Sequence, residues 1–294
     1  MLSADNAVTT GMSNGDHPQY SKAANKIFDV SIYGNVAVTI FGSADIDRVP
    51  WELALKVFRA SQAGNPKLPK ISDYVIALST FLKANPVLFP DQLRTSLKQE
   101  RLRSAMLHVL KQANFLFPGL LDDTKSIPER ILLWDQARNF LVDRFAGSSV
   151  HSSLSEAAYL KTIADSAPFV ADVGTELNNS SLGPVITVAQ ELAELAIAAL
   201  YKEPVAFLEG YTGLVTAGYG DDEIFPQYQC IHVHGHIGSE LLIDVPAYLG
   251  TDYARHEITH DDGSWIQAFA QSSMIDVFTD GFGYSLRNII RKKS

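Results

Sequence analysis

The sequence predicts an α+β protein, because its hydrophobic pattern is strand-like at both ends and helical in between. β-Branched and alternating runs occupy residues 27–32 and 36–41, and strand-like runs return from residue 211 onward. Between about 48 and 203, apolar residues recur at helical spacing instead. Strands from both ends of the chain are therefore expected to form one sheet system that closes across the helical stretch.

Two hairpins are expected where glycine-containing dipeptides separate strand-like runs. Gly34-Asn35 separates the two N-terminal runs, and Gly238-Ser239 separates residues 228–237 from 240–245. Both dipeptides suit the tight turns that join antiparallel strands. Further strands are expected at 211–218, 255–259 and 264–270, followed by a helix over 272–290.

Six helices are expected in the central stretch. Pro50 suits a first helical turn, and Asn85-Pro86 should end the second helix because proline disfavours a helical residue before it. Gly147 is expected just past the end of the fourth helix. The sequence Ser-Leu-Ser-Glu at 153–156 predicts a capping box at the start of the fifth. The Ala-rich run from 185 to 201 predicts a sixth, buried helix.

Charge and composition argue against two classes of partner. The chain of 294 residues carries a formal net charge of −9 and a pI of about 5.3, so a nucleic-acid partner is not expected. The run 185–201 contains Gln190, Glu191 and Glu194 and is shorter than the roughly 20 apolar residues of a membrane span. A lone cysteine, Cys230, excludes an intramolecular disulfide and fits a reducing compartment. We expect a cytoplasmic protein that uses no cofactor, with Cys230 a buried, inert thiol.

Short segments in a fixed order resemble one family. Residues 3–11 are SADNAVTTG, 26–30 are KIFDV, 39–45 are TIFGSAD, 215–220 are VTAGYG with Phe225-Pro226 after them, and 269–272 are FAQS. These segments resemble strands of proteasome β-type subunits and their bacterial relatives in the N-terminal-nucleophile hydrolase superfamily. The resemblance covers roughly residues 1–85 and 210–280.

The resemblance implies a four-layer αββα sandwich formed as a single domain over 1–294, with residues of about 88–205 as a helical insertion. It also implies hydrolysis of peptide or amide bonds. In this family a Thr, Ser or Cys at the mature N-terminus attacks an acyl carbon, and its own α-amine acts as the base. Members of the superfamily associate into oligomers, so self-association is a further expectation.

The catalytic positions follow from the same resemblance. Lys26 corresponds to the lysine that favours the neutral α-amine and the developing alkoxide, and Asp5 to the acid that pairs with it. Gly42 and Ser43 correspond to the glycine turn whose backbone N–H groups stabilise the oxyanion.

One departure from the family bears on activity. The strand that carries the nucleophile would precede Ser3, and Leu2 is too bulky for efficient removal of Met1. Two interpretations stay open: the true start lies upstream, or the chain is a non-catalytic member that keeps the fold for assembly or binding, as proteasome α-type subunits do. The chain as given is expected to be inactive as a threonine-type peptidase.

Alternating histidines support a third hypothesis, a metal-dependent hydrolase. His232, His234 and His236 would share one face of a strand and, with His256 or His260, could ligate zinc. The alternative is a polar, solvent-facing side of the strand whose histidines have no common target.

A basic stretch of the third helix admits two interpretations. It is either an ordinary solvated face or a surface that docks an acidic partner or another subunit. Its members are Arg94, Lys98, Arg101, Arg103 and Lys111.

Overall fold

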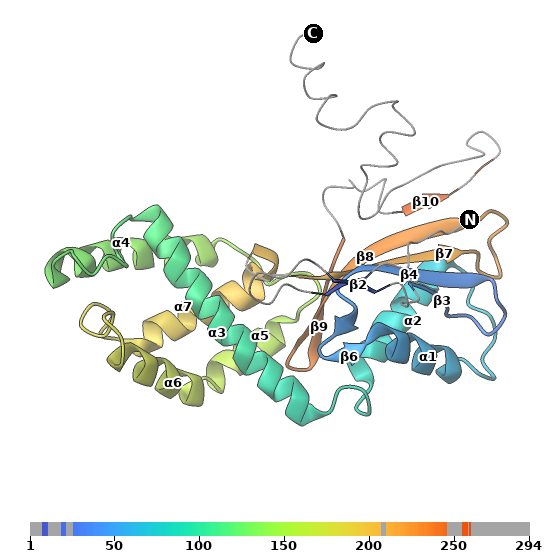
Figure 1. Cartoon of the computed structure of the whole chain (residues 1–294), viewed down its shortest axis with the longest axis horizontal. Coiled ribbons are helices and arrows are strands. Elements are labelled where there is room, and N and C mark those ends of the chain that lie inside the picture. The colour runs from blue at the N-terminus through green and yellow to red at the C-terminus, as the bar shows by residue number, and fades with distance from the viewer. Residues whose placement is uncertain are drawn as a thin grey trace, which may run out of the picture. The chain divides into compact units, whose positions relative to one another are not determined.

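A computed structural model describes residues 8–10, 19–21, 26–206, 210–245, 255–257 and 259 (Figure 1). The chain divides into two compact units, which are described separately. The sheet unit comprises the described residues up to 80, those of 211–233 and those from 244 onward. The helical unit comprises the described residues of 81–210 and 234–243.

The sheet unit is centred on an antiparallel sheet with strand order β10-β8-β7-β4-β3. Its central pair joins β4 to β7, running from Val36 opposite Gly218 to Gly42 opposite Thr212. Strands from the two ends of the sequence therefore pair directly, which confirms the predicted α+β class. The four-layer αββα sandwich stays a prediction. The strands are β3 (Ile27–Asp29), β4 (Val36–Gly42), β7 (Thr212–Gly218), β8 (Gln227–Ile237) and β10 (Arg255–Glu257).

Both predicted hairpins are present. Strands β3 and β4 flank Gly34, whose φ of +70° suits a tight turn, and β8 and β9 (Glu240–Asp244) flank Gly238 at φ +63°. Two smaller antiparallel pairs join β1 (Val8–Thr10) to β2 (Gln19–Ser21) and β5 (Asp45–Ile46) to β6 (Val49–Pro50).

Two helices, α1 (Trp51–Ser61) and α2 (Ile71–Ala84), lie on one side of the sheet (Figure 1). Helix α1 buries Trp51, Ala54, Leu55 and Phe58, the apolar face that its sequence predicts. Helix α2 ends directly before Asn85-Pro86, also as predicted.

The helical unit is built around α7, whose residues from Leu192 to Tyr201 are almost all buried. A helix with apolar residues on nearly all sides is typical of the centre of a core, where other helices surround it. Helix α7 packs against α3, α4, α5 and α6. The helices are α3 (Asp91–Leu116), α4 (Ile127–Ala146), α5 (Glu156–Ala164), α6 (Ala167–Asn178) and α7 (Ala189–Lys202).

The helical stretch differs from its prediction in three details. Helix α6 was not expected. Helix α7 begins at Ala189 rather than near 185. The N-cap of α5 is Ser155 rather than Ser153, whose hydroxyl instead accepts a hydrogen bond from the backbone N–H of Ile243 (3.1 Å). The strand predicted over 264–270 and the helix over 272–290 lie outside the described residues. Among the helices that the structure describes, none combines the length and apolarity that a membrane span requires.

Candidate functional site

The proposed Asp5–Lys26 pair is only half described, because Asp5 lies outside the described residues. Lys26 directly precedes β3 and is partly exposed, and its carbonyl oxygen accepts a hydrogen bond from the backbone N–H of Ile40 on β4 (2.9 Å). The family role of Lys26 therefore stays a prediction.

Gly42 and Ser43 form a turn that is closed by a neighbouring backbone. Gly42 has a φ of +82°, and a Cβ built on it would overlap the carbonyl oxygen of Tyr211, so only glycine fits. The backbone N–H of Ser43 donates to that same carbonyl oxygen (3.1 Å). An oxyanion needs N–H groups that point at it, and in this structure the Ser43 N–H is engaged by the protein itself.

Two histidines of β8 have different partners. His232 lies in the sheet unit and stacks on Tyr211 with ring centroids 3.9 Å apart, whereas His236 lies in the helical unit with its Nε2 3.2 Å from the carbonyl oxygen of Leu82. Gly235 between them has a φ of +98°, which interrupts the regular alternation of a strand.

This arrangement corrects the second interpretation of the histidines, and the metal site with His256 or His260 stays a prediction because those side chains lie outside the described part of the chain. His232 and His236 are buried, so the strand side is not simply solvent-facing. Within the described ranges, no three His, Cys, Asp or Glu side chains gather in a group that could hold a metal ion. Cys230 is fully buried as predicted, and burial raises the pKa of its thiol to about 12.

The basic stretch of α3 is not a uniformly solvated face. Arg94 is buried, and the guanidinium of Arg101 donates to the carbonyl oxygen of His234 (2.8 Å). Arg103 forms ion pairs with two acids of α6 at 3.6 and 3.2 Å. Lys111 remains exposed. Lys98 is partly buried and, together with Arg94, lines a cavity of the helical unit.

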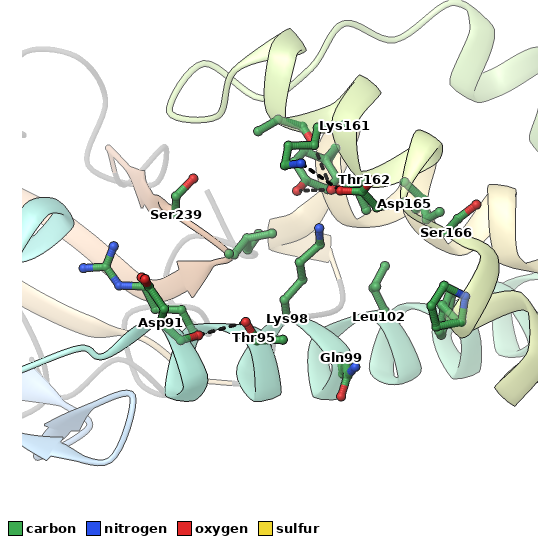
Figure 2. Close-up of a pocket in the computed structure, with 18 residues that line it drawn as sticks. Asp91, Thr95, Lys98, Gln99, Leu102, Lys161, Thr162, Asp165, Ser166 and Ser239 are labelled. Carbon is green, nitrogen blue, oxygen red and sulfur yellow. Dashed lines mark hydrogen bonds and ion pairs between the residues drawn. The ribbon is translucent and has the colours of Figure 1, made fainter. Parts of the chain in front are cut away.

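This cavity, here called the Lys98 pocket, has a volume of about 440 Å³. It is bounded by α3, α5, the start of α6, α7 and the turn between β8 and β9 (Figure 2). Its apolar wall is formed by the buried side chains of Leu102, Phe169, Ile197 and Ile237. The pocket therefore combines an apolar wall with polar groups from five separate segments.

The side chain of Lys98 extends from α3 toward Lys161, Thr162 and Asp165 (Figure 2). Its Cδ lies 3.5 Å from the position that a Cβ on Gly238 would occupy, so the lysine stem packs against the turn. Within the part of the chain that the structure describes, its amine makes no hydrogen bond or ion pair. Burial lowers the pKa of Lys98 from its ordinary 10.5, the charge of Asp165 raises it, and Lys161 lowers it further.

Most of the polar groups facing Lys98 already have partners. Lys161 Nζ lies 2.9 Å from Oδ2 of Asp165. The hydroxyl of Thr162 donates to the carbonyl oxygen of Ala158 (2.8 Å), so the phenol of Tyr201, 2.7 Å away, must donate to Thr162. Burial raises the pKa of this phenol. These groups form the polar rim of the pocket.

Ser166 is the exception on this side of the pocket. It precedes α6 and is 8% exposed. Its backbone is helical (φ −76°, ψ −13°) instead of extended, and its hydroxyl does not cap the helix. No described residue is hydrogen-bonded to that hydroxyl.

This pocket could not be recognised from the sequence, because Lys98 lies in a run of basic residues that resembles a solvated face. Comparison of the chain with models of protein families, with curated proteins and with solved structures finds no match.

Proposed function

We propose that this chain is a small-molecule-binding protein and that its ligand site is the Lys98 pocket. The observation that carries the proposal is a cavity of about 440 Å³ with a buried apolar wall and a few polar groups held by separate elements. Small-molecule sites of proteins typically have volumes of about 300–1,000 Å³ and this mixture of walls.

We also propose that the sheet unit has the proteasome-like sandwich that the sequence resembles, and that it does not catalyse a reaction. The support for this proposal is the hydrogen bond from the Ser43 N–H to the Tyr211 carbonyl (3.1 Å), which engages a donor that an oxyanion would need. This favours the non-catalytic alternative, a binding protein, over a peptidase.

The test of ligand binding uses phenylnaphthylamine, a neutral probe whose fluorescence rises in an apolar site. Thr95 is an exposed residue of α3 that lines the pocket, so Thr95→Trp should fill the pocket and weaken probe binding by about tenfold or more. Thr175 is the matched control. It is exposed on α6, away from the pocket, and its hydroxyl bonds to the carbonyl four residues earlier, as that of Thr95 does.

Thr175→Trp should leave probe affinity unchanged. Absence of binding to the unmodified chain, or equal binding to both tryptophan variants, would reject the pocket as a ligand site.

A second candidate is hydrolysis of peptide or amide bonds, as the family resemblance implies. It is favoured by the position of Lys26, which directly precedes β3 and whose carbonyl oxygen accepts a hydrogen bond from the backbone N–H of Ile40 on β4, the strand that ends at Gly42. A double-mutant cycle of Lys26→Met and Asp5→Asn tests it. A coupling energy well above about 1 kcal/mol indicates the buried pair of the family, whereas an exposed pair gives about 0–1 kcal/mol. Peptide turnover that is blocked by N-terminal-nucleophile inhibitors would favour this candidate over a binding protein.

A further inference from the structure

We infer that the ligand of the Lys98 pocket is an amphipathic organic anion, in which one carboxylate, sulfonate or phosphate group is attached to a hydrocarbon chain or ring and is bound by Lys98. The inference rests on the proposed function, since it names the class of ligand for the same pocket. Three features of the pocket support it.

The first feature is the environment of the Lys98 ammonium group. This group is partly removed from water, and no described acid lies within ion-pair distance of it. The acid that acts on it most, Asp165, forms an ion pair with Lys161 at 2.9 Å. A cation withdrawn from water without a partner is unfavourable, and a ligand anion at this place offsets that cost.

The second feature is an independent donor, the hydroxyl of Ser166. This residue is more than nine-tenths buried and lines the pocket, yet no described group bonds to its hydroxyl. It also directly precedes α6, a helix of 12 residues. The first backbone N–H groups of a helix, together with its dipole, favour a negative charge at that end. The start of α6 and Lys98 therefore favour the same sign of ligand charge.

The third feature is the apolar wall, which determines the uncharged part of the ligand. The wall of Leu102, Phe169, Ile197 and Ile237 is buried and apolar, and it would remain uncovered by an inorganic anion. The charged residues of the lining amount to three cations and two acids, which favours a ligand with a single negative charge. These five residues are Arg94, Lys98, Lys161, Asp91 and Asp165.

The experiment compares two probes that share one ring system. Anilinonaphthalene sulfonate carries a negative charge, and phenylnaphthylamine lacks the sulfonate group. Both are titrated into the full chain at low salt, with fluorescence as the readout. We expect the anion to bind about tenfold or more tightly than the neutral probe, and we expect this advantage to shrink as salt is added.

Three variants test whether the tighter binding of the anionic probe depends on Lys98. Lys98→Met should remove the preference for the anion while the neutral probe still binds, and Lys98→Arg should retain most of it. Lys111→Met is the control, because Lys111 is an exposed lysine of the same helix that does not line this pocket. It should leave both affinities unchanged. Circular dichroism of each variant establishes that it is folded.

The outcomes separate the inference from the function. Equal binding of the two probes to the unmodified chain, or an anion preference that survives in Lys98→Met, overturns the inference and leaves the binding function intact. Failure of both probes to bind overturns the binding function itself. An anion preference lost in Lys98→Met and kept in Lys111→Met supports the inference.

Discussion

The indole Nε1 of Trp51 donates a 2.7 Å hydrogen bond to Oγ1 of Thr212, and both side chains are buried in the sheet unit. The Thr212 hydroxyl in turn donates to the backbone carbonyls of Ser43 (3.1 Å) and Asp45 (3.4 Å). Thr212, the first residue of β7, thus joins the first residue of α1 to the turn that follows β4.

Replacing this threonine should be costly. Thr212→Val keeps the shape of the side chain but leaves the indole N–H without its acceptor, so we expect a loss of about 1–3 kcal/mol in the free energy of unfolding. Thr216→Val is the control on the same strand, because Thr216 is buried and its hydroxyl is bonded to no described residue. That change should be close to neutral. Denaturant unfolding measures both, and equal losses would contradict the assigned role of Thr212.

A pair of glycines tests how tightly the Gly42 turn is packed. Gly34→Ala should cost about 1–2 kcal/mol, the penalty of a left-handed alanine, because the space around Gly34 is open. Gly42→Ala carries the same penalty and also displaces the Tyr211 carbonyl, so its cost should exceed about 3 kcal/mol. The comparison uses urea melts of both variants. A Gly42→Ala variant no less stable than Gly34→Ala would show that the turn is looser than described.

Two serines next to helices of the same unit should respond differently to alanine. Ser155 caps α5 by accepting from the backbone N–H of Ala158 (3.2 Å) and also donates to Glu240 (3.0 Å), so Ser155→Ala should cost about 1–2 kcal/mol. Ser166→Ala should leave stability nearly unchanged because its hydroxyl caps nothing. Thermal melts check both values. A marked loss for Ser166→Ala would indicate that its hydroxyl serves the fold and is not kept for a ligand.

Lys98 should lower the stability of the protein at neutral pH. Because burial lowers the pKa of its amine below 10.5 in the folded state, the unfolded chain binds more protons between the folded pKa and 10.5. Stability from this group therefore rises with pH across that window. Lys98→Met should be the more stable protein at pH ~7, by up to about 1 kcal/mol. The difference should narrow as the pH rises toward 10.5.

Urea titrations of both proteins near pH ~7 and pH ~10 give the comparison. A Lys98→Met variant that is less stable than the parent at neutral pH would mean that the ammonium group stabilises the fold.

Local chemistry explains why some elements could be predicted from the sequence. The hairpins at Gly34 and Gly238 depend on residues that adopt a positive φ, and both glycines do so. The end of α2 depends on Pro86, which restricts the residue before it. In each case one or two residues impose the conformation whatever surrounds them.

Features that arise from packing were not predictable in the same way. Helix α6 contains Gly174, which weakens its helical pattern, yet its buried residues Phe169, Val173 and Leu177 attach it to the core around α7. The surroundings of Lys98 come from α5, α6, α7 and the turn between β8 and β9, segments far from it in sequence. In the sequence, Lys98 could not be distinguished from the neighbouring basic residues of α3.

The pairing of β4 with β7 has a consequence for how the chain folds. Gly42 lies opposite Thr212, so the central ladder of the sheet closes a loop of about 170 residues. In an unfolded chain such a contact is rare, because the entropy lost on closure grows with the length of the loop. The helices between these strands depend mainly on contacts among neighbours in sequence. We expect these helices to form first, which brings β4 and β7 closer together before they pair.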